Sequence, residues 1–237
     1  MNEIQRRRRL LMARAAAAPA PVHGTWEDLF ARIADGTYAT AYSVGEILPL
    51  DLGTAGVVNA QIVAFNADDK ADNSGKAPVT CIAQYLANSA VKYNTSKTAV
   101  GGWKNSNIRT YVSTTLASLF PSEVKNRIVE VKKYSVSYDS NGTKTADDET
   151  DDSYWIPSER EIVGGTSQET SGPTYSTLFS TTRIKKTPNG TNHHWWLRTC
   201  ASKTNPRYVS TSGTGSIYQV KDANASDVYA CLGFCID

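Results

Sequence analysis

Cysteine is scarce in this sequence, which excludes a scaffold built on disulfides. Only Cys81, Cys200, Cys231 and Cys235 occur in 237 residues, and their spacings match no zinc-binding pattern. In an extended strand, the Cα atoms of Cys231 and Cys235 would lie about 13 Å apart, beyond the roughly 7 Å limit for a disulfide. We therefore expect buried thiols, with neither a bridge nor a shared metal.

Long apolar runs and common catalytic motifs are also missing. No stretch approaches the roughly 18 apolar residues of a membrane helix, so no membrane partner is predicted. The sequence contains no phosphate-binding loop, dinucleotide fingerprint or G-x-S-x-G elbow. His193 and His194 are adjacent, so on a strand they face opposite sides and cannot share one metal. The sequence predicts no catalytic residue, no metal and no cofactor.

The net charge of +2 is small and unevenly placed. Residues 1–21 hold five arginines against one glutamate, which leaves −2 on the remainder, so no nucleic-acid partner is predicted. The same residues are rich in helix formers and end in prolines, which predicts a helical tether to a larger assembly. The alternative is a secretory signal, although Arg14 interrupts its apolar part. A weak seven-residue repeat of apolar residues leaves a homo-oligomer open.

Helical and β-type patterns both occur before residue 139. The stretch "GTWEDLFARIADG" predicts a helix capped by Thr25 and ended by Gly36. Short β-type runs follow between residues 38 and 87, separated by turn-forming residues. Helical spacing returns in "NSNIRTYVSTTLASLF", and Ser122 is placed to cap "SEVKNRI" before the strand-like "VEVKKYSVSY". The buried face of the first helix should consist of Trp26, Leu29, Phe30 and Ile33.

The second half of the chain is mostly β-like. The acidic residues 139–152 are expected to form an exposed loop, because a run of carboxylates resists burial. Ser158 and Glu161 form a capping-box pattern that predicts a short helix in "IPSEREI". Beyond Gly172 the chain has β character to its end, with "YSTLFSTTRI" as the first run. We predict one α+β domain over residues 22–237, with short helices in the first two-thirds and a β-rich C-terminal part.

Two stretches resemble sites but have simpler explanations. "NADDKADNSGK" resembles a calcium loop, yet Lys70 occupies a ligand position and no acid closes it, so turn chemistry accounts for it. In "NHHWWLRTCAS", strand alternation places Trp195 on one face and Trp196 with Arg198 on the other. Arg198 could stack on Trp196, but we favour an arginine that ties loops together within a central strand.

Five segments in a fixed order resemble a family of uncharacterised proteins from bacteria and their phages. They are "YSVGEILPLDL", "IVAFNADDKADNSGKAPVT", "GGWKNSNIRTYV", "YWIPSEREI" and "WWLRT", before a closing "ACLGFCI". The resemblance covers roughly residues 25–237. Family members often have His-Asp where this chain has Ala67 and Asp68, and residues 230–234 lack the usual arginine and proline. The structural motif residues are Trp103, Arg109, Trp195, Trp196 and Arg198.

The W-W-L-R strand and the final G-F strand also resemble the C-type-lectin-like fold, in the version shared by formylglycine-generating enzymes and phage receptor-binding proteins. That resemblance implies a mixed, twisted domain whose C-terminal half displays ligand-binding loops. The calcium motifs of sugar-binding lectins, E-P-N and W-N-D, do not occur. Cys231 and Cys235 differ in spacing from the copper-binding cysteines of the enzymes, which makes an oxidase the weaker hypothesis.

Residues 199–229 are the predicted recognition surface. Asn, Ser, Thr and Tyr make up 14 of these 31 residues, a composition typical of surfaces that combine rigid aromatic contacts with adaptable hydrogen bonds. The alternative is a solvated β-meander. The candidate ligand-binding residues are Asn205, Arg207, Tyr208, Tyr218, Asn224 and Tyr229.

The resemblance implies a non-enzymatic phage tail or virion-associated protein. Such a protein would bind a bacterial surface protein or glycan through its C-terminal loops and other virion proteins through residues 1–21. A variant of this hypothesis is that a retroelement diversifies the loops, because adenine-directed mutagenesis enriches these residue types. The alternatives are a secreted or cell-surface bacterial adhesin and a formylglycine-generating-type oxidase.

Overall fold

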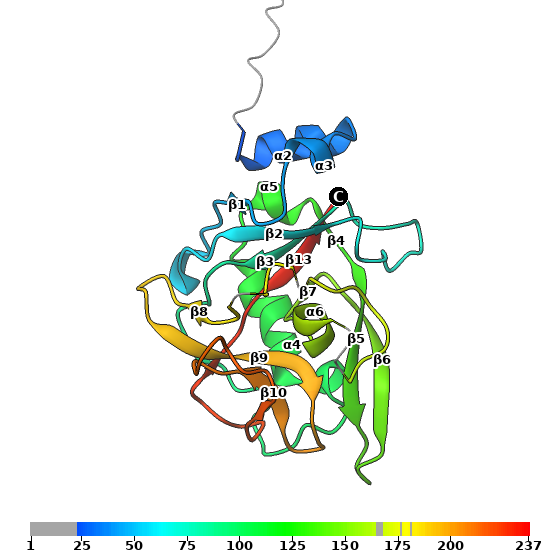
Figure 1. Cartoon of the computed structure of the whole chain (residues 1–237), viewed down its shortest axis with the longest axis vertical. Coiled ribbons are helices and arrows are strands. Elements are labelled where there is room, and N and C mark those ends of the chain that lie inside the picture. The colour runs from blue at the N-terminus through cyan, green and yellow to red at the C-terminus, as the bar shows by residue number, and fades with distance from the viewer. Residues whose placement is uncertain (1–22, 165–167, 176, 181) are drawn as a thin grey trace, which may run out of the picture.

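The computed structural model describes residues 23–164, 168–175, 177–180 and 182–237 (Figure 1). The tether expected over residues 1–21 lies outside these ranges. None of the helices in the described ranges is long and apolar enough to cross a membrane. The protein is a mixed α and β structure of short elements. Its helical segments are α2 (Trp26–Ala34), α3 (Tyr38–Ala41), η1 (Gly53–Ala55), η2 (Trp103–Asn105), α4 (Asn107–Thr110), η3 (Tyr111–Leu116), α5 (Ser122–Lys125) and α6 (Glu159–Val163).

The first sheet places the C-terminal strand between strands that come much earlier in the chain. In order, it contains β1 (Ile47–Leu48), β2 (Ala60–Phe65), β3 (Val79–Ala83), β13 (Gly233–Ile236) and β4 (Ile128–Val129), and β7 (Tyr154–Trp155) also pairs with β13. These pairings are antiparallel, and every residue of β3 and β13 is buried. The C-terminal strand β13 therefore forms part of the core together with strands from much earlier in the chain.

The second sheet is built around the tryptophan-rich strand. β9 (Asn192–Cys200) pairs with β10 (Pro206–Val209) and β8 (Lys185–Lys186) antiparallel and with β12 (Val228–Tyr229) parallel, and β11 (Gln219–Val220) adds to β10. Figure 1 shows β9 and β10 below the first sheet, with the long hairpin β5 (Val131–Tyr138) and β6 (Lys144–Asp152) beside both. β9 is a central strand, as predicted.

Buried tryptophans form much of the core. The indole N–H of Trp195 donates to the Arg183 carbonyl at 3.0 Å, and that of Trp196 donates to the Val91 carbonyl at 2.7 Å. Both rings are therefore buried without leaving a polar atom unpaired. The fully buried tryptophans are Trp103, Trp155, Trp195 and Trp196.

The two helices with capping signals form as predicted. The Thr25 side chain accepts the Asp28 N–H at 3.2 Å and begins α2, and Trp26 and Leu29 are buried beneath it. In the capping box of α6, the Ser158 N–H donates to Glu161 at 2.9 Å and the Glu161 N–H donates to the Ser158 hydroxyl at 3.3 Å. Local sequence was sufficient here because both signals act within one helical turn.

The expected acidic loop is wrong, because residues 144–152 form strand β6. Its partner β5 supplies lysines, and Lys132 lies 3.3 Å from a Glu149 oxygen. The pairing leaves Asp151 exposed while Asp152 points inward and is buried. Because successive side chains of a strand point to opposite faces, the carboxylates of β6 are divided between the two faces of the hairpin. The number of acidic residues in the segment does not reveal this arrangement.

Three smaller expectations also differ from the structure. Ser122 is the first residue of α5 and does not cap it, since the N-cap is Pro121. The helix expected after Asn105 is divided into α4 and the π-helical η3, where the Thr114 hydroxyl donates to the Thr110 carbonyl at 2.6 Å. In the predicted strand over residues 175–184, residues 177–179 form a turn.

Trp196→Ala should destabilise the fold by about 3–5 kcal/mol, because it empties a fully buried site and removes an indole hydrogen bond. Tyr218→Ala is the matched aromatic control, because that side chain is 60% exposed. Chemical denaturation of both variants measures the difference in the free energy of unfolding. Equal losses in the two variants would contradict the assignment of Trp196 to the core.

Candidate functional site

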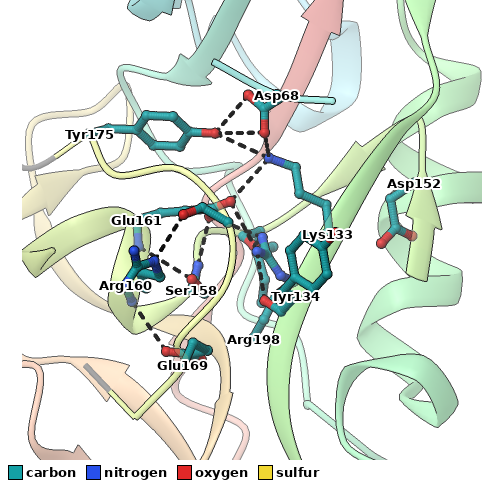
Figure 2. Close-up of polar contacts among 12 residues, drawn as sticks. Asp68, Lys133, Tyr134, Asp152, Ser158, Arg160, Glu161, Glu169, Tyr175 and Arg198 are labelled. Carbon is teal, nitrogen blue, oxygen red and sulfur yellow. Dashed lines mark hydrogen bonds and ion pairs between the residues drawn. The ribbon is translucent and has the colours of Figure 1, made fainter. Parts of the chain in front are cut away.

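Charged side chains meet in the interior between β5, α6 and β9 (Figure 2). The Lys133 ammonium lies 2.6 Å from an Asp68 oxygen and 3.0 Å from a Glu161 oxygen, and it donates to the Tyr175 hydroxyl at 3.2 Å. It also lies 3.4 Å from the centre of the Trp155 ring. Because these four polar side chains are at most 2% exposed, solvent does not screen their charges.

Arg198 extends this network into the second sheet. Its guanidinium contacts both Glu161 oxygens, at 3.0 and 3.1 Å, and donates to the carbonyls of Tyr134 and Ile156. Its Cζ lies 5.5 Å from the centre of the Trp155 ring. The hypothesis that Arg198 ties segments together within the fold is therefore confirmed. We call Asp68, Lys133, Glu161, Tyr175 and Arg198 the buried network.

Asp68 and Lys133 stay charged in the interior through their contacts with each other and with their neighbours. Burial alone would raise the pKa of Asp68, but the Lys133 charge and the hydrogen bonds it receives hold that pKa below its ordinary value. Burial would lower the pKa of Lys133, and the two carboxylates outweigh this effect and raise it. Two cations thus balance two anions, as a buried charge requires.

Sequence reasoning missed Asp68 and Lys133. Residues 66–76 are explained above by turn chemistry, yet Asp68 is fully buried and accepts hydrogen bonds from Tyr175 and Thr80. A weak signal existed, since Lys133 stands between Val131 and Ser135 on the inward face of an alternating strand. A cation at an inward position implies a buried carboxylate partner. Within the described ranges, no cluster of three or more His, Cys, Asp and Glu is placed to hold a metal.

Lys133→Met should cost about 3–5 kcal/mol of stability, because it leaves Asp68 buried without its cation. Adding Asp68→Asn should recover part of that loss, so the double variant should lose less than the sum of the single variants. The neighbouring Lys132→Met is the matched control and should cost below about 1 kcal/mol, as a partly exposed pair. Additive losses in a denaturant-based double-mutant cycle would count against the coupling.

The G-G-W-x-x-S-x-x-R pattern within "GGWKNSNIRTYV" has a structural role in this chain. The Trp103 indole donates to one Asp152 oxygen at 2.8 Å, and Arg109 Nε donates to the other at 2.7 Å. Ser106 caps α4 by accepting the Arg109 N–H at 3.2 Å. At Gly102 a Cβ would lie 2.6 Å from that of Ser137, so only glycine allows this approach. The motif therefore fastens α4 to β6.

A second buried pair connects α6 to the predicted recognition surface. A Glu159 oxygen lies 3.0 Å from Nε of Arg207, and Glu159 is 1% exposed. Burial raises the pKa of Glu159 to about 7, against the lowering effect of Arg207, and the nearby Glu169 raises it further. The Arg207 guanidinium in turn lies 5.6 Å from the centre of the Tyr218 ring.

Glu159 should make stability fall as pH rises. The folded chain holds the Glu159 proton with a pKa of about 7 against an ordinary 4.5, so this contribution is full below 4.5 and lost by about pH 7. Glu159→Gln should therefore flatten the decline of Tm over this window. Burial lowers the pKa of His194, so His194 makes stability rise with pH. This contribution is the same in the wild type and in Glu159→Gln. Parallel Tm profiles from pH 4.5 to 8 would contradict the assignment.

A surface hollow of about 460 Å³ lies among the C-terminal loops. It is lined by Val163, Arg183 and residues 212–218. A larger hollow of about 750 Å³, beside α2 and β4, contains none of the predicted ligand-binding residues. We call the smaller one the loop hollow.

Ser210 organises the loop that lines the hollow. Its hydroxyl is buried and accepts the N–H groups of Ser212 at 3.3 Å and Ser216 at 3.2 Å. The Ser210 N–H donates to the Ser216 carbonyl at 2.9 Å, which closes the loop. The Thr211 N–H donates to Nδ1 of His194 at 3.2 Å, so a side chain of β9 also holds the loop in place.

Arg183 is held at the edge of the hollow by its backbone. Its N–H donates to the Thr214 carbonyl at 2.8 Å, and its carbonyl accepts the Trp195 indole at 3.0 Å. A Cβ on Gly215, where φ is +88°, would lie 3.0 Å from that of Arg183, so glycine permits the close approach. Arg183 has no carboxylate partner among the described residues, and its buried Nε has no hydrogen-bond partner there.

The structure brings only part of the predicted recognition set together. Tyr218 lines the loop hollow and is 60% exposed, and Arg207 lies behind it. Tyr208 is buried, 5.0 Å from His194 between ring centres, so it supports the sheet beneath the surface.

The remaining predicted residues lie away from the loop hollow. Tyr229 is half-buried and stacks on His193 at 4.0 Å. The Asn205 amide donates to Asp222 at 3.1 Å, and Asn224 is exposed. Sequence reasoning missed Arg183, which lies outside the tyrosine-rich segment and reaches the hollow only through the fold.

Comparison with known proteins gives one family. Residues 77–226 match the family described as a domain of unknown function (DUF6273). No curated protein and no solved structure matches the chain. The matched segment contains Lys133, Arg198, Arg183 and the loop hollow, whereas Asp68 precedes it.

Proposed function

The chain belongs to the DUF6273 family, and we propose that it is a non-enzymatic recognition module that binds a bacterial surface protein or glycan through its C-terminal loops. The loop hollow is the observation that carries this proposal. It combines an exposed tyrosine ring, several hydroxyl groups and one arginine, on a loop that Ser210 and His194 hold in place. Concave sites with few, fixed polar groups are typical of ligand binding.

The composition of the hollow supports recognition over a merely solvated loop. Tyr218 offers a rigid amphipathic ring, while Ser212, Thr214 and Ser216 offer hydroxyls and backbone groups. The ring rests on the Arg207 guanidinium, which Glu159 holds from beneath. A ligand would therefore meet a preorganised surface, which lowers the entropy cost of binding.

The buried network supports a scaffold role for the interior. Lys133, Asp68 and Arg198 are charged, but each is paired and closed to solvent. A group that a substrate cannot reach contributes stability rather than chemistry. The cysteines fit the same role, because burial raises the pKa of Cys81, Cys200 and Cys231 and keeps their thiols protonated.

The proposal also covers the fold family and the location of the protein. We assign the chain a C-type-lectin-like fold and a place in a phage tail or virion, with residues 1–21 contacting other virion proteins. The ordered motifs described above support both assignments. A secreted or cell-surface adhesin would use the loop hollow in the same way, and retroelement diversification would act on the same loops. The formylglycine-generating-type oxidase has less support, since Cys231 and Cys235 are buried free thiols.

Thr214→Trp should weaken binding without loss of folding, because an exposed residue of the hollow becomes a bulky ring. The full-length protein would be tested on arrays of purified bacterial surface polysaccharides and surface proteins. The variant should lose affinity by about tenfold or more, which corresponds to about 1.4 kcal/mol. Ser226→Trp is the matched control, exposed in the same segment but outside the hollow. Wild-type protein that binds no array member, or equal losses in both variants, would overturn the proposal.

A further inference from the structure

The ligand class follows from the charge of the loop hollow. Resting on the proposed function, we infer that the hollow binds an acidic sugar unit, with the Arg183 guanidinium on its carboxylate or phosphate and the Tyr218 ring against its apolar face. The two anionic groups share one chemistry, namely negatively charged oxygens that accept hydrogen bonds from a planar guanidinium.

Arg183 has no carboxylate partner among the described residues, whereas several other arginines do. Arg109 lies 2.7 Å from Asp152, and Arg207 lies 3.0 Å from Glu159. Arg198 is paired with Glu161 in the buried network. Each of these cations lies against a carboxyl group that the fold supplies. The charge of Arg183 is left for a partner from outside the described residues.

Among the described residues, the lining of the hollow contains no acid that would oppose an anion. Apart from Arg183, the lining consists of one valine and residues 212–218, whose side chains are neutral. Glu159, which lies behind Tyr218, is buried and held by Arg207. Arg183 is therefore the one formally charged side chain among the described residues that line the hollow.

The fold fixes the backbone from which the Arg183 side chain extends. Both backbone groups of Arg183 are hydrogen-bonded, one to the lining loop at Thr214 and one to Trp195 of the central strand. Gly215 allows the loop to pack against the Arg183 backbone. The backbone of Arg183 and the lining loop therefore need no rearrangement on binding, which lowers the entropy cost of ordering the site.

Tyr218 and the hydroxyl groups of the hollow are suited to contact a sugar ring. The C–H groups on one face of a pyranose ring pack against an aromatic ring, and Tyr218 is exposed for such contact. Ser212, Thr214 and Ser216 lie along the same hollow and can donate to or accept from ring hydroxyls. A simple inorganic anion would use Arg183 and leave these groups unused.

Arg183→Gln tests the inference in the full-length protein. Isothermal titration would compare a hexuronic-acid oligosaccharide with its neutral hexose counterpart, and a glycerol-phosphate oligomer with glycerol. We expect one acidic probe to bind more tightly than its neutral match, and Arg183→Gln to weaken that binding by about tenfold or more. Arg183→Lys should retain part of the affinity, and binding should weaken with added salt.

Lys92→Gln is the charge-matched control, because Lys92 is exposed and does not line the hollow. It should leave binding unchanged, and thermal melts should show that Arg183→Gln remains folded. Preference for the hexuronate or for the phosphate probe decides which anion is recognised. Neutral probes bound equally well by wild type and Arg183→Gln would overturn this inference and leave the proposed function standing. Failure of every probe and of every array member would overturn both.

Discussion

The fold depends most on the ion pairs that Lys133 makes in the interior. From β5, this one ammonium reaches Asp68 in the loop after β2, Glu161 in α6 and Tyr175. Glu161 in turn accepts a hydrogen bond from Arg198 in β9. Segments from both sheets, the hairpin and α6 therefore share one neutral cluster. Since any single loss leaves a buried charge unpaired, the cluster specifies one arrangement of these elements.

That constraint also positions the candidate site. Arg198 fixes β9, and the neighbouring Trp195 on the same strand holds the carbonyl of Arg183 through its indole. Arg183 then holds Thr214 in the loop that lines the hollow. The charged interior and the polar surface are thus connected by a short series of direct contacts. In our proposal, the buried charges keep a recognition surface rigid, and Arg183, which has no carboxylate partner among the described residues, gives that surface its ligand preference.

Sequence reasoning succeeded where the deciding contacts are local and failed where they are distant. The caps at Thr25 and Ser158 and the central position of β9 were predictable, because each follows from spacing within a few residues. The acidic residues 144–152 were not, because their burial depends on lysines from β5. At the candidate site, the sequence pointed to Tyr218 and Arg207 through composition. It did not point to Arg183, and it gave Tyr208 a surface place that the sheet does not allow.

By itself, the amino-acid sequence determined where helices begin, which strands alternate, that tryptophans would be central, and that Arg198 would join segments. Tertiary structure alone decided which charges are paired. Lys133 meets Asp68 across 65 residues and Arg198 meets Glu161 across 37, whereas Arg183 meets no carboxylate among the described residues. The physical reason is that a charge is satisfied by whatever lies within a few ångströms, and only the folded chain sets those distances.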